Sequence, residues 1–138
     1  MHKITTDIVT QYLRRRGDNP EVAYFGNSQF VIGWQVKMPD FELIYRMEND
    51  ELIICNFNAR QDVENNNKAV SAFVKFIHQL EKSSSQIKQV RGMLLDSLET
   101  KVVELRQRLA EALIYQGACW QEIEGDVWLI YHMGVRTT

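Results

Sequence analysis

The side chains that most often carry out chemistry are few and scattered in this sequence. Its histidines are His2, His78 and His132, and none has neighbouring cysteines or paired carboxylates at the spacing of a metal site or a catalytic triad. The cysteines, Cys55 and Cys119, each lie in an apolar stretch outside any C-x-x-C pattern. We expect both to be small buried side chains rather than redox groups or ligands. The sequence therefore predicts no catalytic residue and no metal site.

Composition excludes some classes of partner. The 138 residues include 16 basic and 18 acidic side chains, for a formal net charge of −2. This leaves no basic surplus to bind a phosphate backbone, so we expect no nucleic-acid partner. The longest apolar runs are too short to cross a bilayer, and Met1–Thr6 lacks the apolar region of a signal peptide. We therefore expect a soluble cytoplasmic protein with no membrane partner.

Hydrophobic periodicity predicts the helices and strands that would have to position the residues of any functional site. Turn and cap residues separate these elements, and no repeat or linker interrupts them. The pattern predicts one domain over residues 1–138. The predicted helices begin near Thr5 or Thr6, Asn66 or Asn67, and Ser97 or Thr100; the predicted strands are Gln29–Lys37, Phe41–Glu48, Glu51–Asn58, Ile87–Leu95, Cys119–Ile123 and Val127–Met133.

The predicted order of elements is α-βββ-α-β-α-ββ. A helix between Glu51–Asn58 and Ile87–Leu95 implies a right-handed crossover that makes these two strands parallel, while the other strands pair in antiparallel fashion. The fold class expected is therefore α+β, with a mixed, mostly antiparallel sheet. This order resembles the core topology of the GCN5-related N-acetyltransferase fold, which is a likeness of topology and does not establish activity.

The segment expected to bind a cofactor in such a fold argues against an enzyme. An acetyltransferase holds the pyrophosphate of acetyl-CoA on backbone amides, usually in a glycine-containing loop before a helix. The corresponding segment here, Arg60–Asn67, has no glycine, and Asp62 and Glu64 add negative charge. We therefore expect no cofactor and no enzymatic activity.

A second likeness rests on particular runs of sequence between about Glu21 and Ile130. These runs are Ala23–Gly26, Leu43–Glu48, Leu52–Phe57, Met93–Asp96, Arg106 with Arg108 and Leu109, Gly117–Ala118 and Gly125–Trp128. In these runs the chain resembles the SseE/EseE family of type III secretion system proteins, and more distantly the low-calcium-response protein R family. The segment from Arg60 to Lys68 matches least.

The resemblance implies a non-enzymatic accessory protein, a chaperone or regulator, in the bacterial cytoplasm. Such a protein would support secreted translocator proteins or their chaperones through protein–protein contact. Two alternatives stay open: a degenerate acetyltransferase-like enzyme, and a subunit of the cytosolic secretion platform. The client and the oligomeric state are also left open, a homodimer included.

A protein of this kind needs an exposed aromatic surface for its partner. Strand alternation places Trp120, Glu122 and Glu124 on one face of the terminal hairpin, where the indole shares its face with charges. Tyr24 and Phe25 precede the first long predicted strand. We expect these five residues to bind the partner, with Trp120 as the anchor.

Overall fold

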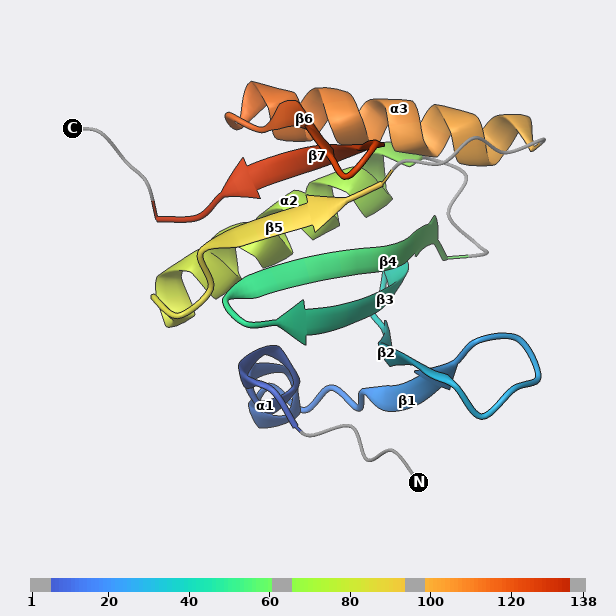
Figure 1. Cartoon of the computed structure of the whole chain (residues 1–138), viewed down its shortest axis with the longest axis vertical. Coiled ribbons are helices and arrows are strands. Elements are labelled where there is room, and N and C mark those ends of the chain that lie inside the picture. Colours follow the sequence, from blue (N-terminus) through green and yellow to red (C-terminus); the bar gives the residue numbers. More distant parts are fainter. Residues whose placement is uncertain (1–5, 61–65, 94–98, 135–138) are drawn as a thin grey trace.

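The computed structural model describes residues 6–60, 66–93 and 99–134 (Figure 1). Three helices and seven strands are formed by these residues. In chain order they are α1 (Ile8–Arg15), β1 (Glu21–Tyr24), β2 (Val31–Lys37), β3 (Phe41–Glu48), β4 (Glu51–Ala59), α2 (Asn66–Ser83), β5 (Gln89–Gly92), α3 (Thr100–Tyr115), β6 (Cys119–Ile123) and β7 (Asp126–His132).

The strands form one mixed sheet in the order β1-β2-β3-β4-β5-β7-β6. β4 and β5 are parallel, joined through α2, and every other neighbouring pair is antiparallel. This confirms the α+β class, the mostly antiparallel sheet and the crossover. The strand β1 was not predicted, because it has four residues, and its pairing with β2 is interrupted by a register shift between Ala23 and Tyr24.

One face of the sheet holds the main core, to which all three helices contribute. Tyr45, Leu52 and Leu129 are buried on this face together with Leu13 of α1 and Leu109 of α3. The opposite face has its own buried residues. These are chiefly Ile53 and Ile130, at 3% and 1% exposure, which lie outside the helix-covered cluster.

The helix α1 is fixed at its start and on its buried face by side-chain hydrogen bonds. Asp7 is the N-cap, and its Oδ1 accepts a hydrogen bond from the Thr10 amide at 2.8 Å. Thr10 is itself buried, and its Oγ1 lies 2.7 Å from the hydroxyl of Tyr45 in β3. The predicted cap at Thr5 or Thr6 was therefore wrong: a carboxylate next to the first apolar turn takes that position.

The terminal hairpin turns through two residues with positive φ, Glu124 at 51° and Gly125 at 88°. Such a pair is typical of a type I′ connection, whose twist matches that of the flanking strands. β6 follows α3 after residues 116–118, and it is an edge strand of the sheet.

Both cysteines are free and exposed, so their predicted burial was wrong. Cys119 lies on β6, which is an edge strand of the sheet and pairs with β7. Cys55 is the extra residue of an irregular pairing in β4. Neither the edge position of Cys119 nor the bulge position of Cys55 could be inferred from the apolar flanking sequence, which is why the prediction failed.

In the part of the chain that the structure describes, no helix combines the length and apolar character that a transmembrane span requires.

Candidate functional site

The parallel strands β4 and β5 separate part-way along the sheet. Their pairing extends from Glu51 opposite Gln89 to Ile54 opposite Gly92, whereas β4 continues to Ala59. On its other side, β4 stays paired with β3 over this whole length. The last four residues of β4, Asn56–Ala59, therefore pair with β3 but no longer with β5.

A β-bulge lies at the point where the two strands separate. Ile44 pairs with Asn56 and Tyr45 with Ile54, so that Cys55 is an extra residue on β4. A bulge bends its strand and leaves the extra residue outside the regular ladder. Here the bend coincides with the end of the β4–β5 pairing.

A cavity of about 70 Å³ occupies the divergence, and we call it the divergence cavity. A volume of this size can hold several water molecules or a short aliphatic chain. Its walls combine the separated strands with the two long helices and β7. The lining residues are Ile54–Phe57, Val90–Met93, Phe73, Ile77, Arg106, Leu109, Leu113, Leu129 and Tyr131.

The polar groups of this cavity are few and are anchored from outside it. The hydroxyl of Tyr131 donates to Oε1 of Glu81 in α2 at 3.0 Å, and Oε2 of the same carboxylate accepts from the Gly134 amide at 2.9 Å. This carboxylate therefore ties β7 and the residues after it to α2. The phenol of Tyr131 is held in place at the cavity wall.

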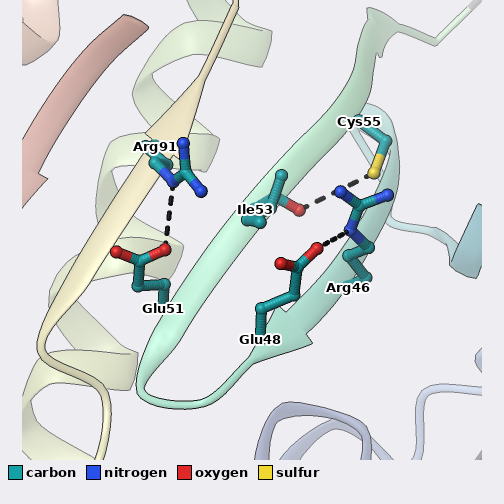
Figure 2. A network of polar contacts seen from close by, with 6 residues as sticks. All are labelled: Arg46, Glu48, Glu51, Ile53, Cys55 and Arg91. Carbon is teal, nitrogen blue, oxygen red and sulfur yellow. Dashed lines mark hydrogen bonds and ion pairs between the residues drawn. The ribbon is translucent and has the colours of Figure 1, made fainter. Parts of the chain in front are cut away.

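On the opposite face of the sheet, a polar network runs along β3, β4 and β5 (Figure 2). Helix α2 lies behind the strands in this view, on the far side from the network. Nε of Arg91 lies 3.1 Å from Oε2 of Glu51, and its guanidinium lies 4.2 Å from the ring centre of Trp128. Arg46 pairs with Glu48 at 2.6 Å, next to Cys55.

Burial raises the pKa of the Cys55 thiol above its ordinary value; Arg46 opposes this rise and Glu48 adds to it. The residue as a whole is exposed, but its sulfur lies against the sheet, 3.9 Å from the carbonyl oxygen of Ile53. A thiol in this setting is protonated at neutral pH and is a weak nucleophile. Cys55 is therefore suited to shaping the bulge rather than to covalent chemistry.

Cations gather near the start of α2. Lys68 lies in its first turn, and Nη1 of Arg108 in α3 donates to Oδ1 of Asn67 at 2.7 Å. Arg106, on the same helix, lines the divergence cavity. The acidic Asp62 and Glu64, on which the case against a phosphate-bearing ligand rested, lie outside the described residues. The described residues thus offer an apolar cavity with Arg106 in its wall, and two further cations, Lys68 and Arg108, at the start of α2. An acyl thioester that carries an anionic group is a ligand of matching chemistry.

Comparisons with known proteins identify similar folds but no close relative. Neither a protein-family model nor a curated protein sequence matches the chain. Among solved structures, the ribosomal-protein-S18-alanine N-acetyltransferase from Escherichia coli matches with a TM-score of 0.48 and 11% identity, over 75% of this chain and 70% of that one. Tetrahymena GCN5 matches with a TM-score of 0.39 and 9% identity, over 93% of this chain and 78% of that one. The expected resemblance to the GCN5-related N-acetyltransferase topology is confirmed.

These similarities concern the fold alone, yet they run against the function that we expected. The two solved structures described above are acetyltransferases, and neither supports a secretion chaperone. The expectation of a non-enzymatic type III secretion accessory protein was therefore wrong, as was the expectation that the chain is no enzyme. The alternative, an acetyltransferase-like enzyme, is the better supported. The likeness to the SseE/EseE family stays a prediction.

The five residues predicted to bind a partner lie in two separate places. Trp120, 49% exposed, and Glu122 lie on the edge strand β6, while Glu124 lies in the following turn. Tyr24 and Phe25, 51% and 69% exposed, lie at the opposite edge of the sheet. The structure does not bring the two groups together, and a partner role for either stays a prediction.

The cavity residues were missed because their proximity is a product of the topology. Ile54, Gly92 and Leu109 come from three elements, and each is an ordinary core or turn residue in the sequence. The parallel pair was predicted, but the extra residue at Cys55 leaves no mark in the apolar run around it. Only the register with β3 reveals the bulge.

Proposed function

We propose that this chain is an acetyltransferase-like enzyme that binds an acyl thioester in the divergence cavity and presents its carbonyl group to an acceptor amine. A thioester supplies an activated carbonyl carbon; a carbon–nitrogen bond forms there, the carbon–sulfur bond breaks, and the thiol leaves with a proton. The chain itself has to hold the acyl group, orient the carbonyl and stabilise the negative charge that develops on its oxygen.

One observation carries the proposal: the bulge at Cys55 lies where β5 leaves β4 and the cavity begins. A bulge removes backbone groups from regular ladder pairing. Backbone amides that are already oriented toward a developing oxyanion can lower a barrier by several kcal/mol. We assign this role to the backbone around Cys55 and Asn56, so that it does not depend on the thiol.

The remaining walls match the other parts of such a ligand. Phe73, Ile77 and Leu109 provide an apolar surface for an acyl chain and its linker. Arg106 provides positive charge at the cavity wall, and Lys68 adds a second positive charge in the first turn of α2, where an anionic group is also favoured by the helix dipole. The absence of glycine before α2 predicts weaker phosphate contacts than a glycine-rich loop would make.

Isothermal titration calorimetry with acetyl-CoA tests the proposal. We expect saturable binding to the full chain and at least about tenfold weaker binding to Leu113→Trp, because the larger side chain fills the cavity. Gln107→Trp is the matched control, since it adds the same side chain at an exposed position of the same helix. Melting temperatures establish that both variants fold.

Two results would contradict the proposal. A folded wild-type chain that gives no heat of binding at millimolar acetyl-CoA would exclude the ligand. Equal affinity of Leu113→Trp and Gln107→Trp would place binding outside the divergence cavity. Location in the bacterial cytoplasm, the expected protein partners and the absence of nucleic-acid or membrane partners stay predictions.

A further inference from the structure

The two edges of the sheet differ in how they are protected against further pairing. The β1 edge has four residues, follows Pro20 and carries a register shift, all of which discourage another strand from adding to it. The β6 edge has the sequence Cys-Trp-Gln-Glu-Ile, with no proline or lysine, and it pairs with β7 in unbroken register. Four of its five residues are exposed. Within the described residues, β6 is therefore the edge strand that remains open to a further strand.

The backbone groups that face this open edge follow from the turn. A two-residue type I′ hairpin is closed by a hydrogen-bonded pair, which here is Ile123 and Asp126. Alternation along an antiparallel ladder then directs the amides and carbonyls of Cys119, Gln121 and Ile123 toward β7. Those of Trp120 and Glu122 point away from β7, toward the open edge.

We propose that this edge binds β6 of a second copy of the chain, antiparallel and about a two-fold axis through Gln121. In this register Trp120 of one copy forms the hydrogen-bonded pair with Glu122 of the other, and all five residues of β6 are paired. The two sheets join into one continuous sheet. The inference is independent of the proposed acyltransferase activity.

Side-chain complementarity selects this register and a second copy as the occupant. Each Glu122 lies opposite the indole of Trp120 from the other copy, which covers an exposed aromatic side chain. On the other face, Cys119 lies opposite Ile123, and Gln121 lies opposite its own equivalent. A two-fold axis through Glu122 would instead place two carboxylates directly opposite each other, which is destabilising. The strand is thus complementary to itself, as an isologous interface requires.

Disulfide cross-linking tests the register directly in the full chain carrying Cys55→Ser and Cys119→Ser. Gln121→Cys would face its own equivalent across the axis, at the roughly 4.5 Å Cα separation of a non-hydrogen-bonded pair. We expect it to form a covalent dimer under mild oxidation. Ile123→Cys is the matched control, because its equivalent would lie roughly 13 Å away, beyond the reach of a disulfide.

Sedimentation equilibrium provides the second measurement. Glu122→Pro removes an amide that points to the open edge, where proline is compatible with an edge strand, so the monomer should remain folded. We expect it to weaken dimerisation by about tenfold or more, whereas Glu122→Ala keeps the amide and the dimer. The inference is overturned if the wild-type chain stays monomeric at high micromolar concentration. It is also overturned if Gln121→Cys cross-links no better than Ile123→Cys, or if Glu122→Pro dimerises as well as the wild type.

Discussion

At the scale of single residues, Cys55 shows how position can outweigh residue type. Its thiol lies on the sheet face that Arg46 and Glu48 share, and burial raises its pKa above the ordinary value. A raised pKa means less thiolate at any pH below it, and the thiolate is the form that reacts with alkylating agents. The residue can therefore be exposed and still react slowly.

Alkylation of Cys55 by iodoacetamide should report this environment in a Cys119→Ser background. We expect slower alkylation than that of an unstructured thiol peptide at about pH 8, with the rate still rising at higher pH. Glu48→Gln should speed the reaction, because it removes a charge that raises the pKa, and Arg46→Gln should slow it. Equal rates for the two variants would show that these charges do not act on the thiol.

A buried hydrogen bond between Thr10 and Tyr45 joins α1 to the sheet. Oγ1 of Thr10 also lies 3.2 Å from Oδ2 of Asp7 and donates to it, so Tyr45 acts as the donor to Thr10. Burial raises the pKa of this phenol well above its ordinary value, which keeps the donor protonated. Thr10 thus connects the helix cap to the centre of β3.

Replacing Thr10 by valine should lower the free energy of unfolding by about 1–3 kcal/mol, because a buried phenol loses its acceptor. The measurement is chemical denaturation of the full chain. In the double variant with Tyr45→Phe, much of this loss should disappear, since no donor is then left unpaired. Additive losses in the two single variants would mean that the two hydroxyl groups do not interact.

At the scale of elements, what could be predicted separates clearly from what could not. The long helices and the strands β2, β3, β4, β6 and β7 follow from periodicity and turn residues, because burial of one face imposes a regular pattern. The parallel pairing of β4 with β5 follows from the helix between them. The strand β1 and the true extent of β5 did not follow, since four-residue strands carry too little pattern.

The site was less predictable than the fold for the same physical reason. The bulge at Cys55 depends on a pairing between two strands, and the cavity depends on where β5 leaves β4. Neither is encoded within one element. The argument from Asp62 and Glu64 considered one segment only, and it could not include Arg108, which the fold brings to the start of α2.

The two ends of the β4–β5 pairing should respond differently to truncation. Leu52 is fully buried, and Leu52→Ala should cost about 2–5 kcal/mol of unfolding free energy. Ile54 is partly buried and already borders the divergence cavity, so Ile54→Ala should cost less, about 1–2 kcal/mol. Denaturation midpoints of the two variants provide the measurement. Equal costs would mean that the strands do not separate beyond Ile54.

At the scale of the whole molecule, the helices and the main core lie on one face of the sheet, while its two edges remain at the surface. The β1 edge is shortened and irregular, and the β6 edge is regular. An unprotected edge is a site of pairing with another chain. If pairing through β6 is part of the native assembly, the stability of the fold depends on protein concentration, because the associated state is favoured by mass action.

The melting temperature should therefore rise with protein concentration in the wild-type chain. Between about 2 and 200 µM we expect an increase of a few degrees, since dimerisation stabilises the native state and not the unfolded state. In Glu122→Pro this rise should be smaller, because its outward amide is absent and the dimer is weakened. Glu122→Ala should behave like the wild type, which separates loss of the amide from loss of the carboxylate.

A melting temperature that rises equally in wild type and Glu122→Pro would show association through another surface. A constant melting temperature in the wild type would show that the β6 edge stays unpaired over this range.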